Sequence, residues 1–97
     1  MIDDFGFAPP PFNPGEALLQ LRRTLRGLKL SERAEGFELR GKRVLEVKQI
    51  GIELQVRVAR RLALTPEWDA LTLVSHADQR KLLDEIKKRL ARWERDE

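Results

Sequence analysis

The sequence predicts an α+β fold: an N-terminal helix, an antiparallel meander of three to four strands and a long C-terminal helix, with both helices packed on one sheet face. Leucines recur at spacings of three and four near both ends of the chain, as they do on helices. Between them, apolar and charged residues alternate, as they do on strands. With 97 residues, the chain suffices for one two-layer domain. We place that domain at residues 13–95.

Residues 1–12 form a separate tail, rich in proline and phenylalanine. Three consecutive prolines favour an extended polyproline II stretch and exclude a helix. The tail is therefore expected either to be flexible, with one phenylalanine packed on the body, or to act as a short linear motif that docks into an aromatic groove. The candidate partner-binding residues in it are Phe5, Phe7 and Phe12.

Residues 13–29 predict the first helix. Asn13 can cap it, Pro14 suits the first helical position, and Glu16 completes a capping box. Its apolar stripe consists of Leu18, Leu21, Leu25 and Leu28. Residues 30–36 are expected to be a connector.

Residues 37–64 alternate with period two and predict three strands. A three-residue loop at 41–43 would pair Leu39 with Leu45 and Phe37 with Val47, which puts all four on one face. The apolar phase shifts between residues 47 and 52, which indicates a turn or a bulge there.

A turn centred on Ile50-Gly51 would set Lys48 opposite Glu53, a favourable charge pair. The third strand would then contribute an apolar row to the core, made of Ile52, Leu54, Val56 and Val58. Residues 61–64 would prolong this strand beyond its neighbour and form an exposed edge. Residues 65–67 look like a helix start, but residues 70–74 alternate and include β-branched side chains, so we expect a turn at 65–69 and a fourth strand at 70–74.

Residues 75–95 predict the long C-terminal helix. Ser75 and Asp78 form an S-x-x-D helix start. One face carries Leu82, Ile86, Leu90 and Trp93, and two acid-before-base pairs at a spacing of four support the helix.

The composition excludes most chemistry. The chain has no cysteine and one histidine. This composition excludes disulfides, thiol nucleophiles and cysteine-based or three-histidine zinc sites. His76 falls in the first turn of the last helix, and no nucleotide-binding or nucleophile motif occurs. We therefore expect no catalytic residue, metal, cofactor or small-molecule substrate, and no enzyme. Without a membrane span or a signal peptide, the expected location is the cytoplasm.

The charge is segregated along the chain. The whole chain has a net charge of +3, but residues 36–65 alone carry seven basic and three acidic side chains, a net +4. This basic middle is the best nucleic-acid signal in the sequence, although the predicted outer sheet face lacks aromatic side chains for base stacking. The candidate nucleic-acid contacts are Arg40, Arg43, Lys48, Arg57 and Arg61.

The leading hypothesis is a non-catalytic interaction module, either a protein-binding adaptor or a chaperone-like homodimer. A small sheet leaves edges that gain by pairing in a symmetric dimer, and Trp68 is a candidate partner anchor. The element order is similar to that of secretion-chaperone-like folds, a likeness of architecture without a shared motif. The alternative is a nucleic-acid-binding accessory protein that contacts phosphates through the basic sheet face.

Overall fold

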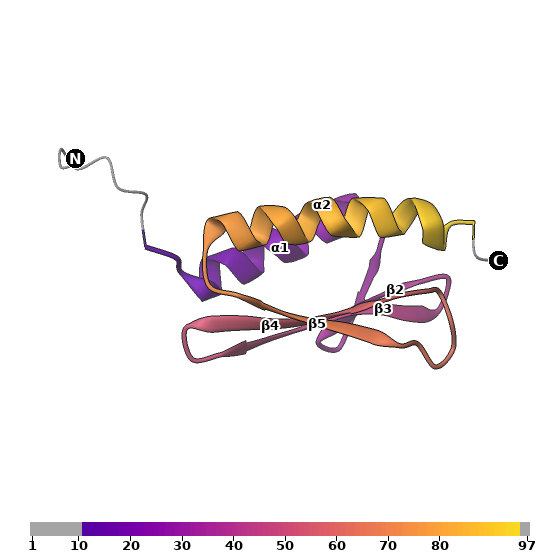
Figure 1. The fold of residues 1–97 in the computed structure, drawn as a ribbon, viewed down its shortest axis with the longest axis horizontal. Coiled ribbons are helices and arrows are strands. Elements are labelled where there is room, and N and C mark those ends of the chain that lie inside the picture. The colour runs from indigo at the N-terminus through magenta and orange to yellow at the C-terminus, as the bar shows by residue number, and fades with distance from the viewer. Residues whose placement is uncertain (1–10, 96–97) are drawn as a thin grey trace.

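The computed structural model describes residues 11–95 as a sheet covered on one side by two helices (Figure 1). In chain order the elements are α1 (Pro14–Gly27), β1 (Ser31–Arg33), β2 (Gly36–Leu39), β3 (Lys42–Ile50), β4 (Glu53–Ala59), β5 (Trp68–Leu73) and α2 (His76–Trp93). The strands form one antiparallel sheet in the order β1-β2-β3-β4-β5. The predicted α+β class and element order are confirmed.

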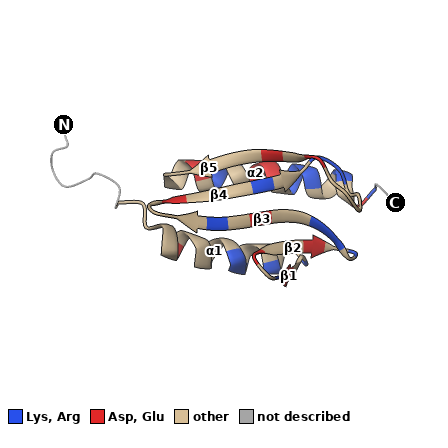
Figure 2. Ribbon diagram, turned by 90° about the horizontal axis from the view of Figure 1, so that it is seen from below, with Lys and Arg blue, Asp and Glu red and all other residues tan. Residues whose placement is uncertain are grey.

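The core lies between the sheet and the two helices, and the opposite sheet face is left uncovered (Figures 1 and 2). α1 contributes Leu21 and Leu25, and α2 contributes Leu82, Ile86 and Trp93, all of them buried. Leu54, Val56 and Val58 face these helices from β4. The predicted apolar stripes of both helices therefore point into the core.

Both helices begin where the capping residues predict. The side chain of Asn13 accepts a hydrogen bond from the backbone N–H of Glu16, at 3.1 Å. At α2, the hydroxyl of Ser75 accepts from the N–H of Asp78, and the Asp78 carboxylate accepts from the N–H of Val74 at 2.9 Å. These bonds satisfy backbone donors that have no partner inside the helix.

The meander has five strands, so the prediction of three to four was too low. The missed strand is β1, which lies inside the predicted connector at 30–36 and pairs with β2 from Ser31–Glu38 to Arg33–Gly36. All three residues of β1 are exposed, so its sequence shows no apolar alternation that could have indicated a strand.

The predicted pairing of β2 with β3 was wrong. Leu39 pairs with Lys42 across a two-residue turn, in which Arg40 and Gly41 both have positive φ angles, 54° and 79°. Such angles suit the tight hairpin turns that match strand twist. A register shift between Phe37 and Glu38 then sets Phe37 opposite Leu45 instead of Val47.

The turn between β3 and β4 lies one residue later than predicted. Ile50 pairs with Glu53, so Gly51 and Ile52 form the turn, and Gly51 adopts a φ of 60°. Ile52 is 78% exposed and does not join the core row in which it was predicted. The shifted register places Glu46 opposite Arg57, which replaces the expected Lys48–Glu53 pair.

β4 ends at Ala59, so the predicted extension through residues 61–64 is wrong. The N–H of Arg60 donates to the carbonyl of Glu67, which closes a loop that returns the chain at once to β5. β5 pairs with β4 in one continuous register from Trp68–Ala59 to Leu73–Leu54. The predicted fourth strand therefore exists, and it forms the edge of the sheet.

Candidate interaction surfaces

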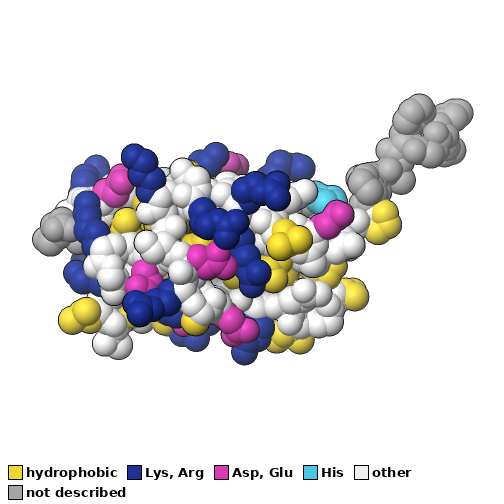
Figure 3. Space-filling view, turned by 180° about the vertical axis from the view of Figure 1, so that it is seen from behind, with side chains coloured by type: hydrophobic (Ala, Val, Ile, Leu, Met, Phe, Trp, Pro, Cys, Tyr) yellow, Lys and Arg dark blue, Asp and Glu magenta, His cyan; other side chains and the backbone are white. Residues whose placement is uncertain are grey.

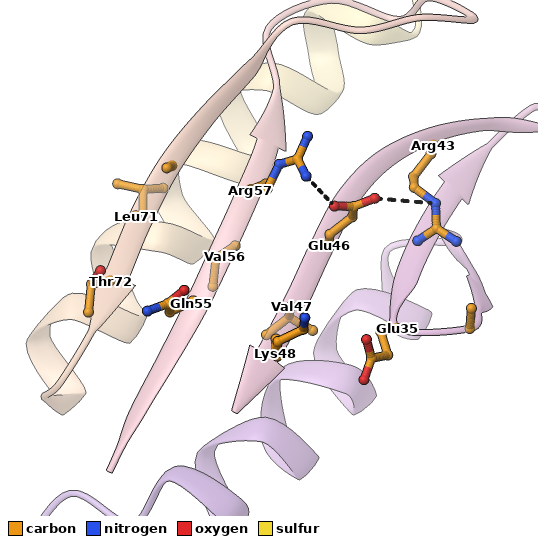
Figure 4. A pocket seen from close by; sticks show the side chains of 12 residues that line it. Glu35, Arg43, Glu46, Val47, Lys48, Gln55, Val56, Arg57, Leu71 and Thr72 are labelled. Carbon is orange, nitrogen blue, oxygen red and sulfur yellow. Dashed lines mark ion pairs between the residues drawn. The ribbon is translucent and has the colours of Figure 1, made fainter. Parts of the chain in front are cut away.

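The uncovered sheet face is hollowed between β3, β4, β5 and the loop after β1. The hollow has a volume of about 520 Å³. Charged and polar side chains project over it from neighbouring strands (Figure 4). Its charged lining residues are Glu35, Arg43, Glu46, Lys48 and Arg57.

Glu46 lies between two arginines in this hollow. Its Oε1 is 3.0 Å from Nη1 of Arg57, and its Oε2 is 3.8 Å from Nε of Arg43 (Figure 4). The Arg57 guanidinium also lies 4.7 Å from the centre of the Trp68 ring, a cation–π distance. Two of the predicted phosphate contacts therefore already have an anionic partner, which lowers their attraction for a phosphate backbone.

Arg43 reaches its place because residue 36 is a glycine. A Cβ at Gly36 would collide with the Arg43 guanidinium and with the backbone carbonyl of Leu45. The guanidinium crosses this gap and donates to the carbonyl of Arg33 at 3.2 Å. Arg43 thus links β3 to the end of β1. Its guanidinium therefore contacts both the Arg33 carbonyl and the Glu46 carboxylate.

Of the three remaining candidate nucleic-acid contacts, Lys48 lines the hollow, whereas Arg40 and Arg61 lie outside it. Lys48 lines it from β3, and within residues 11–95 it forms neither an ion pair nor a side-chain hydrogen bond. Arg40 belongs to the β2–β3 turn, where its Nη1 is 3.4 Å from the carbonyl of Glu94. Arg61 is exposed in the loop after β4. The structure brings Arg43, Lys48 and Arg57 together, and neither Arg40 nor Arg61 lines the hollow.

The aromatic candidates fall in different places. Phe12 packs against the core, and its ring meets that of His76 edge to face at 5.6 Å between centroids. Trp68 begins β5 and packs half-buried against the core, below Arg57. Trp93, the other tryptophan of the chain, is fully buried. Phe5 and Phe7 lie outside the described residues.

A second concave surface lies between β5 and α2. This groove of about 440 Å³ is lined by exposed Leu71 and by buried Leu73 and Leu82, beside charges of both signs on α2. Leu71 is 38% exposed, and Val74, just beyond the strand, is 49% exposed. The groove runs along the free side of β5. Sequence reasoning missed it, because a different segment was predicted as the edge.

Arg89 anchors this side of the molecule. Its side chain is only 14% exposed, its Nη2 is 2.8 Å from Asp69 Oδ2, and its Nε is 2.7 Å from Glu85 Oε2. Its Nη1 donates to the carbonyls of Val58 and Ala59, at 3.4 and 3.2 Å. One guanidinium therefore links α2 to both β4 and β5, a fork that suits arginine and not lysine.

The charges around Arg89 follow from these bonds. Hydrogen bonds from Arg60 and then from Arg89 hold the pKa of Asp69 below its usual value. Burial by itself would lower the pKa of Arg89, but its bonds to Glu85 and Asp69 outweigh that and raise it. At the start of α2, the bond from the Val74 N–H lowers the pKa of Asp78. Asp69, Asp78 and Arg89 are therefore charged at neutral pH.

The opposite side of the molecule mixes its charges. Glu32 on β1 is 2.8 Å from Arg26 and 3.3 Å from Arg22, both on α1. Figure 3, which views the molecule from this side, shows acidic side chains among the lysines and arginines. The basic group of α1 is thus partly neutralised by β1.

The described residues, 11–95, contain no group of three metal-binding side chains, and neither of their helices has an apolar stretch that could cross a membrane. The chain matches no family model, no curated protein and no solved structure. Any function assigned to it therefore depends on its own surfaces.

Proposed function

We propose that this protein is a non-catalytic interaction module that binds protein and assembles as a homodimer, either as an adaptor or as a chaperone-like subunit of the cytoplasm. The observation that carries the proposal is the β5 edge. Among residues 11–95, no strand pairs with the outer side of this six-residue strand, and apolar Leu71 and Val74 are exposed beside it. Unpaired strand edges with apolar neighbours are surfaces on which another chain can pair.

The size of the domain supports self-association. A chain of 97 residues buries a smaller fraction of its surface than a larger domain does, so added apolar burial in a dimer is a large relative gain. A symmetric dimer also removes the exposed edge on both copies at once, which a monomer cannot do.

The test is the mass of the protein in solution. Light scattering after gel filtration should give twice 11.3 kDa at micromolar concentration. The dimer should persist in high salt, because backbone hydrogen bonds and apolar contacts are screened much less than surface charges. A monomer at high micromolar concentration would refute the homodimer.

A second candidate, nucleic-acid binding through the open sheet face, is favoured by one observation. Arg43, Lys48 and Arg57 line the same hollow, and Lys48 has no anionic partner among residues 11–95. Glu46 opposes such binding because it pairs with both arginines.

The variant Glu46→Gln separates the two candidates. If phosphates bind in the hollow, this change should strengthen DNA or RNA binding, and the affinity should fall steeply with added salt. If neither the wild type nor the variant binds nucleic acid at about 50 mM salt, the second candidate is excluded.

A further inference from the structure

We propose that two copies of this chain pair antiparallel through β5, with the two-fold axis at Ala70, so that their sheets join into one. This inference rests on the proposed homodimer and names its interface. The backbone groups of β5 that do not bond to β4 decide how a second strand can pair.

The hydrogen bond from the Arg60 N–H to the Glu67 carbonyl fixes the pattern. In an antiparallel ladder, hydrogen-bonded pairs alternate with non-bonded pairs. Counting from Arg60–Glu67 along the register, the residues of β5 that bond to β4 are Asp69, Leu71 and Leu73. The backbone N–H and C=O groups of Trp68, Ala70 and Thr72 therefore point away from the sheet.

The series of backbone groups that can bond to a second strand ends before Val74. The N–H of Val74 donates to the carboxylate of Asp78 at 2.9 Å, as part of the cap of α2, and cannot bond to another strand. Within the described part of the chain, the backbone N–H and C=O groups of Trp68, Ala70 and Thr72 have no partner, so a second strand can bond to three of each.

Symmetry and charge select the register. With a two-fold axis at Ala70, this residue pairs with Ala70 of the second copy, and Trp68 pairs with Thr72 of the second copy. Each backbone N–H and C=O group that points away from the sheet then forms a hydrogen bond. An axis at Asp69 would set two like charges opposite each other. An axis at Leu71 would pair Trp68 with Val74, whose N–H is already bonded to Asp78.

The side chains agree with this arrangement. β5 carries neither proline nor lysine, and its register with β4 is unbroken, so three devices that block edge pairing (proline, lysine and a bulge) are missing from residues 68–73. The charge of Asp69 is engaged by Arg60 and Arg89 at 2.9 and 2.8 Å. Exposed Leu71 would be covered by the second copy, whose own Leu71 lies diagonally opposite.

Joining the sheets at β5 also joins their surfaces. A two-fold axis perpendicular to the sheet places all helices on one side and both open faces on the other. The hollow of the open face already extends to Ala70, Leu71 and Thr72. The two hollows would therefore meet at the axis and form one concave surface, available to a protein partner.

Single cysteines test the axis directly, because the chain has none of its own. Across an axis at Ala70 the two Cα atoms of residue 70 lie about 5.5 Å apart, within disulfide range. Those of residue 71 lie diagonally, at roughly 7–8 Å, which is too far. Under mild oxidation, Ala70→Cys should become a covalent dimer. Leu71→Cys, and Ser31→Cys on β1 as the control for chance collisions, should stay largely uncrosslinked.

Two variants test the pairing without a crosslink. Ala70→Pro removes an N–H that β4 does not use, so the protein should stay folded and become a monomer. Ala70→Lys leaves the backbone intact and sets two like charges at the axis, which should weaken the dimer about tenfold or more. Circular dichroism and the thermal unfolding transition check that each variant is folded.

The outcomes separate the interface from the proposed homodimer. If the wild type has the mass of a dimer but Ala70→Cys crosslinks no better than Ser31→Cys, or folded Ala70→Pro remains a dimer, the β5 interface is refuted while the homodimer stands. Crosslinking of Leu71→Cys in place of Ala70→Cys refutes the axis at Ala70. A monomeric wild type refutes both proposals.

Discussion

The two edges of the sheet are built differently. β1 has three residues, all exposed, and its Glu32 is clamped by Arg22 and Arg26 of α1. β5 has six residues, an unbroken register with β4 and exposed Leu71 beside its free side. Short, charged edges resist pairing with other chains, whereas long and flat edges invite it. The difference makes β1 an edge that resists pairing and supports the proposal that a second chain pairs with β5.

The largest effect should come from a proline that breaks the β4–β5 ladder. The N–H of Leu71 bonds to β4 and that of Ala70 does not, so Leu71→Pro should lower the free energy of unfolding by about 3 kcal/mol, because it removes a ladder hydrogen bond and leaves a β4 carbonyl without its donor. Ala70→Pro should cost much less. Urea unfolding at a concentration where the wild type is dissociated measures both, and equal losses would contradict the assigned ladder.

The next effect concerns the anchor that holds β5 to α2. Arg89→Ala should lower the free energy of unfolding by about 2 kcal/mol, because it removes hydrogen bonds to two carboxylates and two buried carbonyls. Arg89→Lys should recover only part of this loss, since an ammonium cannot form the same fork. Full stability of Arg89→Lys would show that the fork is unimportant.

Low pH should destabilise the folded protein, because it protonates Asp69 and removes the ion pairs that this residue forms on β5. Its pKa is lower in the folded protein than the 3.8 expected for a free carboxyl, so its contribution is fully present above about pH 5 and is lost as the pH falls through the folded value. Asp69→Asn should therefore be less stable than the wild type at pH 7, and the difference should shrink below pH ~4. Denaturant unfolding at a series of pH values measures this. Parallel curves for the two proteins would contradict the assigned role.

The smallest effect should come from β1. Glu32→Gln removes ion pairs among side chains that are partly exposed to solvent, so the expected loss is below about 1 kcal/mol. The mass of the protein in solution should not change, because β1 takes no part in the proposed dimer. A shift to monomer in this variant would assign the interface to β1.

The helices and the core row were predictable because their signals are local. Asn13 and Ser75 cap the helices, leucine stripes give their buried faces, and Leu54, Val56 and Val58 alternate on β4. These features depend only on neighbouring residues in the chain. They therefore placed both helices and the third predicted strand close to where the structure has them.

The registers and the edges were not predictable in the same way. β1 has no buried side chain to mark it, and the β3–β4 register depends on whether the turn begins at Ile50 or at Gly51. The edge was assigned to residues 61–64 because the sequence does not reveal that the chain turns back after Ala59. Glu46 pairs with Arg57 only in the observed register. The ion pairs of the open face therefore could not be predicted without that register.

Amide hydrogen exchange along β5 tests the central claim most directly. In a dimer paired at Ala70, the amides of Trp68, Ala70 and Thr72 should gain protection as the protein concentration rises, while those of Asp69, Leu71 and Leu73 are protected by β4 at every concentration. We expect this alternation between neighbouring amides of β5. If the amides of Trp68, Ala70 and Thr72 exchange at unprotected rates even at high micromolar concentration, the β5 interface does not form.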